Sequence, residues 1–362
     1  MKTYTKLGSV ITQIRGVSYK PSDVTTAANP NAIALLRANN IQDEGLNFDD
    51  LVYVDKKKVS SEQLLRKGDI LVCSSSGSKN LVGKAAVVNE DLPIAFGAFC
   101  KVIRVLTMDA AFVGQYFRSP RYRREISAAS AGANINNIRN EHIDDMLLPV
   151  YSKAEQVGMA QKLSCVDTLI DQRRGQLAMM EQLVKSRFIE MFGTIDNNSH
   201  GFKIVTLVDA SSDFFAGGDK PDDCVLTPDE NHPFPVYANG YENAGLQGFS
   251  GNCRVEKEAV TVSARGTIGY CFIRKANFTP IVRLITIVPR DDVSVVYLKY
   301  AIDMMKIQSS GTSQAQLTVP DFKRERIIVP PIELQEQFAA FVEQVDKSKY
   351  QRVFTYGMEV AA

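Results

Sequence analysis

The chain has 362 residues, of which 45% are hydrophobic and 23% charged, a composition that excludes a disordered, a collagen-like and a small disulfide-scaffold protein. Its formal net charge of +1 is uneven, because residues 1–152 carry 19 basic and 15 acidic side chains whereas residues 193–332 carry 14 and 16. No apolar run reaches the ~18 residues that a membrane span needs, and the first residues contain no secretory signal. The six cysteines form no C-x-x-C pair, so we expect reduced core thiols in a cytoplasmic protein.

In chain order, the first predicted elements are short runs rich in β-branched and apolar residues. These predicted strands are residues 70–73, 84–88 and 99–105. Residues 110–125 predict a helix, and a loop rich in Ser, Gly and Asn follows at 127–137. A short apolar strand then ends at Pro149.

One long helix is predicted from about residue 154 to residue 192, where Gly193 ends it. Arg173 and Arg187 interrupt an apolar seam with a period of 3.5 residues, which is typical of a coiled coil. At 1.5 Å per residue such a helix would span roughly 57 Å. The apolar positions of the seam are Met159, Leu163, Val166, Ile170, Leu177, Met180, Val184 and Met191.

The second half of the chain repeats this order of elements. Its predicted strands are residues 260–263, 269–273 and 284–288. A helix near 294–307, a polar loop at 309–316 and a strand ending at Pro330 come next. A second heptad helix follows and becomes polar after Asp346. Its apolar positions are Leu334, Phe338, Phe341 and Val345.

Matched motifs indicate that the two halves are an internal repeat. Lys20-Pro21 recurs as Lys220-Pro221, with Gly16 and Gly218 preceding them. Residues 146–149 match 327–330, and Glu155-Gln156 matches Glu336-Gln337 at the same offset of 181. The predicted fold class is therefore α+β with an internal pseudo-repeat. The predicted domains are residues 1–152, 153–192, 193–332 and 333–362, in which two β-rich domains are each followed by a long helix.

The sequence contains no complete motif for catalysis or for nucleotide or metal binding. Residues 77–85 resemble a phosphate-binding loop, but five residues separate the glycines and Ala85 stands where Ser or Thr would hold magnesium. His142, His200 and His232 lie in unrelated segments and form no metal pair. We therefore expect a chain that is not an enzyme and binds no cofactor of its own.

The order of these motifs resembles the specificity subunit of a type I restriction-modification enzyme. The resemblance rests on residues 132–138 leading to Pro149, residues 313–317 leading to Pro330, and residues 262–269. It implies two target recognition domains that read a bipartite site on double-stranded DNA, held apart by two helices packed as an antiparallel coiled coil. It also implies two modification (methyltransferase) subunits and restriction (translocase and endonuclease) subunits as partners. S-adenosylmethionine, ATP and magnesium would then be bound by those partner subunits.

Candidate DNA contacts follow from the chemistry of the loop residues. Arginine bonds guanine in bidentate fashion, and Asn and Gln bond adenine. Arg118 and Arg121 belong to the densest basic run, which would grip phosphates. Solvated turns and exposed helix faces use the same residue types, so this alternative stays open. The candidates are Ser74, Ser75, Ser76, Ser78, Lys79, Asn80, Arg118, Arg121, Asn134, Asn136, Asn137, Arg139, Asn239, Tyr241, Arg265, Thr267, Gln314 and Gln316.

The heptad residues are predicted to pack one long helix on the other and to leave outer helix faces for partner subunits. The helical contact residues are Met159, Leu163, Val166, Ile170, Leu177, Met180, Val184, Phe338, Phe341 and Val345. Three other functions remain open: a fused modification-restriction enzyme, a coiled-coil assembly protein without DNA specificity, and a truncated or silent specificity allele.

Overall fold

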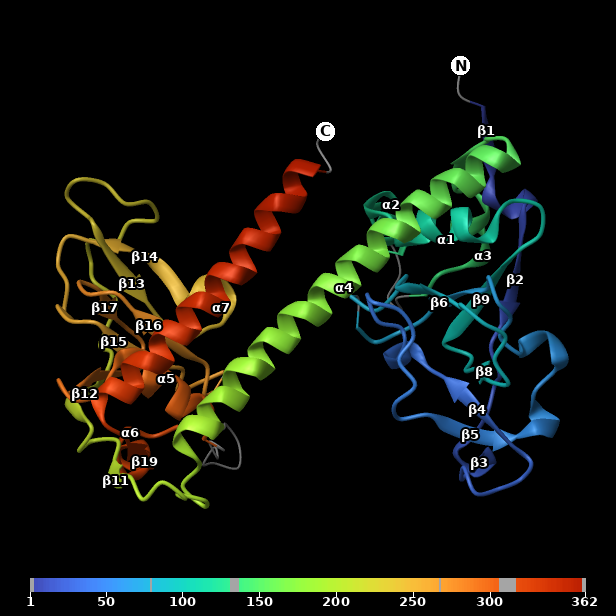
Figure 1. Ribbon diagram of the computed structural model, residues 1–362. Coiled ribbons are helices and arrows are strands. Elements are labelled where there is room, and N and C mark those ends of the chain that lie inside the picture. The colour runs from blue at the N-terminus through green and yellow to red at the C-terminus, as the bar shows by residue number, and fades with distance from the viewer. Residues whose placement is uncertain (1–2, 79, 131–136, 267, 306–316, 360–362) are drawn as a thin grey trace. The chain divides into compact units, whose positions relative to one another are not determined.

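The computed structural model describes residues 3–78, 80–130, 137–266, 268–305 and 317–359 (Figure 1). The chain forms two compact units, Met1–Asp171 (unit 1) and Gln172–Ala362 (unit 2), each with a mixed α+β fold. Within the described ranges, no helix is long and apolar enough to cross a membrane.

A four-stranded antiparallel sheet forms the centre of unit 1. Its strands, in spatial order, are β2 (Ile11–Arg15), β9 (Cys100–Val105), β6 (Ile70–Cys73) and β7 (Ala85–Val87). Successive side chains of a strand point to opposite faces of the sheet. In β6, Ile70 and Val72 therefore enter one hydrophobic cluster and Leu71 and Cys73 enter another, and all four are buried. This explains why the apolar run at 70–73 predicted a strand correctly.

A second sheet of unit 1 has the order β3 (Val24–Thr25), β5 (Val52–Asp55), β4 (Ala32–Leu36) and β8 (Ala95–Phe96). Strands β4 and β8 pair in parallel, whereas the other neighbours are antiparallel. A third, two-stranded sheet joins β1 (Tyr4–Lys6) to β10 (Leu147–Pro149). It brings the start of the unit to the segment that precedes the long helix.

The segment predicted as one helix at 110–125 is helical, but the structure divides it into two helices. Helix α1 (Ala110–Arg118) begins at Asp109, whose carboxylate accepts a hydrogen bond from the Phe112 N–H at 3.0 Å. Helix α2 (Pro120–Ser130) begins at a proline, which lacks the N–H that a continuous helix would need at this point. A shorter helix, α3 (Asn140–Asp144), precedes β10.

Unit 2 also contains a four-stranded antiparallel sheet. Its order is β12 (Ser211–Ala216), β18 (Ile285–Pro289), β15 (Ala259–Val262) and β16 (Cys271–Arg274). The two central sheets have the same strand order. In each, the strand that comes first in the sequence (β2 or β12) pairs with the one that comes last (β9 or β18), and the second and third strands in the sequence follow in that order.

The remaining elements of unit 2 surround this sheet. A three-stranded sheet has the order β14 (Leu246–Ser250), β13 (Phe234–Tyr237) and β17 (Thr279–Pro280), with β13 and β17 parallel. The other elements are β11 (Lys203–Thr206), β19 (Arg326–Val329), α5 (Val295–Asp303), α6 (Val319–Arg324) and α7 (Ile332–Glu359). Strands β11 and β19 pair antiparallel.

Short 3-10 turns connect several of these elements. They are η1 (Leu7–Ser9), η2 (Pro21–Asp23), η3 (Ala38–Asn40), η4 (Lys56–Lys58), η5 (Ser61–Gln63) and η6 (Glu242–Gly245).

Helix α4 (Lys153–Phe192) confirms the predicted long helix to within one residue. It ends because Gly193 adopts φ +74°, a left-handed conformation that glycine takes without steric cost, while its N–H bonds the Ile189 carbonyl at 2.8 Å. The six cysteines are free, but only Cys73, Cys100 and Cys271 are buried. Cys165 is exposed on α4, so its prediction as a core thiol is wrong.

The apolar seam of α4 has different surroundings at its two ends. In unit 2, Val184, Phe188 and Phe192 are buried, and the Phe188 ring lies 5.4 Å from the ring of Phe338 on α7. On the part of α4 in unit 1 and just beyond it, four seam residues are 40–50% exposed. Those exposed residues are Leu163, Val166, Ile170 and Leu177.

A buried glutamine ties the first turn of each long helix to an earlier helix. The Gln156 side chain accepts from the Asp109 N–H at 2.8 Å, at the start of α1. The Gln335 side chain accepts from the Ser294 N–H at 2.8 Å, at the start of α5. The predicted counterpart of Gln156 was Gln337, which is exposed, so that correspondence is wrong by two residues.

The strand pairs before the long helices have the same register. Leu7 N–H bonds the Met146 carbonyl at 2.8 Å, and Leu207 N–H bonds the Glu325 carbonyl at 2.8 Å. Both this pair of acceptors and the pair of buried glutamines differ by 179 in residue number. The offset of 181 was wrong because Pro330 was matched to Pro149 by identity, although it lies beyond the last residue of β19.

Candidate nucleic-acid interface

Three segments of unit 1 meet where β6 ends and β9 begins. The Phe99 carbonyl accepts hydrogen bonds from Ser74 N–H at 2.9 Å, Ser75 N–H at 3.0 Å and the Ser74 hydroxyl at 3.0 Å. From the third segment, Ile138 N–H bonds the Ser74 carbonyl at 2.8 Å, and Asn137 forms an isolated bridge with Ser75. The serine-rich loop and the segment that begins at Asn137, which are distant in the sequence, therefore meet at one end of the sheet.

The predicted contacts of the serine-rich loop differ in how far they are exposed. Ser74 is 6% exposed and its hydroxyl is used by the Phe99 carbonyl, so this side chain holds the loop and faces the protein. Ser75 and Ser76 are half-buried, whereas Ser78 and Asn80 are exposed. The exposed pair can meet a partner without rearrangement of the loop.

Arg118 and Arg121 lie on helices, and each already forms an ion pair with a carboxylate of the protein. The guanidinium of Arg118 forms an ion pair and hydrogen bonds with Asp167 on α4. Arg121 pairs with Glu125 at 2.8 Å, and this hydrogen bond raises the pKa of the arginine. Both side chains are nevertheless about two-fifths exposed, with values of 38% and 43%. They can contact phosphates only while sharing their charge with these carboxylates.

Arg139 and Asn140 stand at the start of α3, beside the same edge of the sheet. Arg139 is exposed, and its Nε donates to His142 Nε2 at 3.3 Å. The Asn140 side-chain oxygen accepts from the buried ammonium of Lys101 at 2.8 Å. Burial lowers the pKa of Lys101. The buried Lys101 thus holds the start of α3 through Asn140, while Arg139 stays at the surface.

Unit 2 brings the corresponding segments together where β15 ends and β18 begins. Leu317 N–H bonds the Ala264 carbonyl at 2.9 Å, in the same way as Ile138 bonds Ser74. The Asn239 side chain accepts from Ala264 N–H at 2.8 Å and donates to the Val282 carbonyl at 2.6 Å. Asn239 was predicted to contact DNA, but its amide links three loops of the protein to one another.

Exposed aromatic and basic side chains surround this edge of unit 2. Tyr241 is 61% exposed, and its ring lies 4.8 Å from the ring of Tyr270, which is 45% exposed. Arg265 is also exposed. Tyr241 and Arg265 were predicted as DNA contacts, whereas Tyr270 was missed because it lies within the predicted strand 269–273, where a tyrosine is typical of a core.

Six predicted contacts lie outside the described residues. They are Lys79, Asn134, Asn136, Thr267, Gln314 and Gln316.

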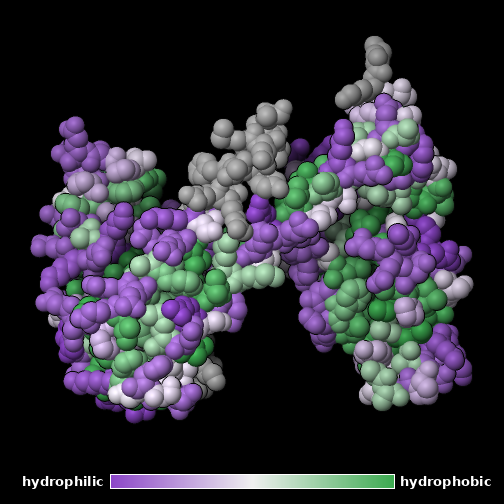
Figure 2. Space-filling model, in the orientation of Figure 1, coloured by the Kyte–Doolittle hydropathy of each residue, from purple (hydrophilic) through white to green (hydrophobic). Residues whose placement is uncertain are grey.

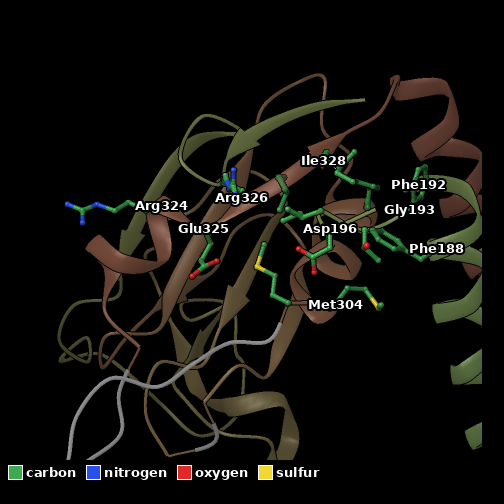
Figure 3. Close-up of a pocket in the computed structure, with 15 residues that line it drawn as sticks. Phe188, Phe192, Gly193, Asp196, Met304, Arg324, Glu325, Arg326 and Ile328 are labelled. Atoms are coloured by element: carbon green, nitrogen blue, oxygen red, sulfur yellow. The ribbon is translucent and has the colours of Figure 1, made fainter. Parts of the chain in front are cut away.

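A cavity of about 590 Å³ lies elsewhere in unit 2, between the end of α4, α5 and β19 (Figure 3). Its lining includes Phe188, Phe192 and Met304, and it contains none of the predicted DNA contacts. In Figure 3, Arg324 extends away from the other labelled side chains. Among the residues that the structure describes, no group of three or more His, Cys, Asp or Glu side chains could hold a metal ion.

Figure 2 shows hydrophilic residues over much of the visible surface of both units, interrupted by smaller hydrophobic areas. An interface for nucleic acid is more polar than a protein–protein interface. In each unit, the segments that meet at this end of the central sheet form a loop edge with exposed polar, basic and aromatic side chains. The two loop edges are therefore the candidate sites.

Comparison with known proteins also points to DNA recognition. Residues 213–352 match the type I restriction modification DNA specificity domain. The chain is 37% identical over 180 residues to the type I restriction enzyme EcoKI specificity subunit of Escherichia coli (strain K12). It is 36% identical over 180 residues to the StySPI specificity subunit of Salmonella potsdam. Each alignment covers 49% of this chain but only 39% of the relative's length.

The fold is similar to that of a solved structure, the S subunit of a type I restriction-modification system from M. genitalium. The TM-score is 0.58, and the comparison covers 100% of this chain and 92% of that chain at 17% sequence identity. At this identity the likeness supports the mixed α+β fold.

Proposed function

Because the chain belongs to the specificity-subunit family of type I restriction-modification systems, we propose that it reads a bipartite DNA target for such a complex. The observation that carries the proposal is the pair of matching loop edges. In each unit, a hydrogen bond from Ile138 or Leu317 brings a distant segment of the chain to the end of the central strand β6 or β15. Two separate reading edges suit a target made of two half-sites.

We propose that the two units are an internal repeat. Their central sheets have the same strand order. The close approaches are also alike: a Cβ on Gly16 would lie 2.1 Å from the Gly97 carbonyl oxygen, and one on Gly217 would lie 2.6 Å from the Pro280 carbonyl carbon. Gly217, rather than Gly218, is thus the counterpart of Gly16. A repeat that keeps its framework while its loops diverge can read two different half-sites.

The proposed spacer is an antiparallel coiled coil made by α4 and α7. Its support is the packing in unit 2, where Phe338, Val342 and Val345 of α7 are buried in one cluster with Val184 and Phe188 of α4. A stiff helical spacer keeps two recognition units at a fixed separation and phase on DNA, which a flexible linker would not do.

The exposed seam of α4 supports a further helical partner. At the offset of 179, Leu163 and Val166 correspond to Val342 and Val345, which are buried in unit 2. Apolar side chains at heptad spacing bind another helix by inserting into its grooves. We propose that helices of the modification subunits, or further turns of the spacer, cover this seam in the complex.

In this proposal the chain has no catalysis of its own. Two methyltransferase subunits would bind S-adenosylmethionine and methylate adenine, and restriction subunits would bind ATP and magnesium. The chain would position these subunits on the DNA.

The proposal is tested by co-expressing the chain with the methyltransferase subunit of its host and purifying one through a tag on the other. We expect a stable complex whose binding to duplex DNA is selective for one sequence. A complex that forms but binds all duplexes alike would favour an assembly protein without DNA specificity. Failure of the two subunits to associate would contradict the proposal.

A further inference from the structure

Phe99 and Arg283 occupy the same place in the two units, just before the strand (β9 or β18) that pairs with the central strand. The residue after Phe99, Cys100, accepts a hydrogen bond from the Gly16 N–H at 3.3 Å. The residue after Arg283 accepts one from the Gly217 N–H at 2.8 Å. Because Gly16 and Gly217 are themselves counterparts, these bonds place Phe99 and Arg283 at equivalent points of the two loop edges.

The Phe99 ring is exposed although its backbone is tightly held. Three donors from Ser74 and Ser75 bond its carbonyl, yet the side chain is 69% exposed. Large apolar side chains normally gain free energy by burial, so a ring fixed in this position is available to a partner. The hydrogen-bonded backbone also means that little conformational entropy is lost when the ring is contacted.

Arg283 is also exposed on a constrained backbone. Val282 and Arg283 have φ values of +52° and +60°, a left-handed conformation that is unfavourable for both residue types. Hydrogen bonds hold it in place: Asn239 donates to the Val282 carbonyl at 2.6 Å, and the Arg283 N–H donates to the Gly217 carbonyl at 3.0 Å. Strained backbone of this kind is found where a side chain must be aimed at a site.

We propose that Phe99 and Arg283 are the paired specificity residues of the two units and that they read different bases. This inference rests on the proposed function. The Phe99 ring has no hydrogen-bonding group, so it makes apolar contact with the methyl group of thymine in the major groove. The Arg283 guanidinium donates two hydrogen bonds to the O6 and N7 atoms of guanine. One half-site then carries an A·T pair where the other carries a G·C pair.

The test uses the full chain in complex with its methyltransferase subunits and starts from the methylated sequence of the wild-type complex. Duplexes with each base of that sequence replaced in turn compete for binding. We expect Phe99→Ala to lower the preference for thymine at one position of one half-site about tenfold. Arg283→Ala is expected to lower the preference for guanine at one position of the other half-site by a similar factor.

Matched variants separate this effect from unfolding. Leu106→Ala removes a side chain that is 61% exposed just beyond the other end of the same strand, and Lys257→Ala removes an exposed charge of unit 2. Both are expected to keep the wild-type base preferences. Phe99→Leu keeps an apolar side chain and Arg283→Lys keeps a charged donor that can still reach O6 and N7 of guanine. Each should therefore retain more of the base preference than the alanine variant does.

Two results would overturn the inference while leaving the proposed function intact. One is that both alanine variants retain every wild-type base preference. The other is that they lose affinity equally for all duplexes, which would make Phe99 and Arg283 general contacts. A wild-type complex that does not form, or that has no base preference, would instead contradict the proposed function.

Discussion

Buried polar side chains decide how the long helices are attached to the two units. Gln335 is fully buried, and besides accepting from Ser294 it donates to the Asp292 carbonyl at 3.0 Å and the Pro330 carbonyl at 2.8 Å. One amide thus satisfies three backbone groups at the start of two helices. A buried backbone group that loses its partner costs free energy of about 1–3 kcal/mol.

Gln335→Ala is therefore expected to lower the free energy of unfolding of unit 2 by about 2–4 kcal/mol, because it leaves these backbone groups without a partner. Differential scanning calorimetry of the full chain measures the change. The control is Gln337→Ala at the exposed position two residues later, which should change stability by less than about 0.5 kcal/mol. Equal effects of the two substitutions would contradict the register derived from the hydrogen bonds.

Cysteine reactivity is a second test at the level of single residues. Burial raises the pKa of the Cys73 thiol to about 11. Burial also raises the pKa of Cys100 and Cys271. Because the thiolate is the reactive form, and its fraction falls as the pKa rises, these thiols react slowly near neutral pH.

At pH 8 we expect iodoacetamide to label the exposed Cys165 first and the three buried thiols only after unfolding. Labelling of Cys73 should become faster as the pH rises towards about 11, where its thiolate forms. Peptide mass spectrometry after timed labelling gives the order. Rapid labelling of Cys73 at pH 8 in the folded protein would show that the end of β6 is open to solvent.

The sequence predicted the loops that form the candidate site better than the roles of individual residues. It placed Ser74 and Asn239 among the DNA contacts because loop serines and asparagines often bond bases. In the fold, their polar atoms bond the protein's own Phe99 carbonyl, Val282 carbonyl and Ala264 N–H. Only the tertiary structure shows which backbone groups are near enough to use these side chains. Phe99 was missed for the opposite reason, since it was placed in the predicted strand 99–105, where an apolar residue is typical of a core.

At the level of elements, six predicted strands are confirmed to within about two residues, because each is a short run rich in β-branched or apolar side chains. They are the strands predicted at 70–73, 84–88, 99–105, 260–263, 269–273 and 284–288. Other strands were missed. Strand β12 (Ser211–Ala216) contains two serines and an aspartate, and its place in the sheet depends on pairing with β18 rather than on its own propensity. The helix predicted at 110–125 ran across Pro120, where the structure ends one helix and begins the next.

The two ends of the α4 seam provide a stability prediction. Phe338→Ala is expected to lower the free energy of unfolding of unit 2 by about 3–5 kcal/mol, because it leaves a cavity against Phe188 and Phe192. Leu163→Ala removes a seam residue that is 48% exposed and should cost less than about 1 kcal/mol. Calorimetry of the isolated chain compares them.

The exposed position, Leu163, should also matter when the complex forms. If helices of the methyltransferase subunit cover the exposed seam, Leu163→Asp will weaken co-purification with that subunit while the isolated chain keeps its melting temperature. Unchanged co-purification would indicate that this part of α4 is not a partner surface.

On the scale of the whole molecule, sequence order alone indicated two similar halves, because the loose matches between them occur in the same order. The exact residue-by-residue correspondence between the two halves could be found only from the hydrogen bonds, because insertions in the loops change the difference in residue number along the chain. The central claim is that unit 1 and unit 2 each read one half of a divided DNA target. It requires that each half of the target depends on one unit only.

The most direct test is genome-wide mapping of methylated adenines in cells that express the complex. A second strain carries the same complex with residues 1–152 replaced by the corresponding part of a relative. We expect one interrupted motif, with two specific blocks around a gap of fixed length, and the replacement should change only one block. An uninterrupted motif, or a change in both blocks, would contradict the account.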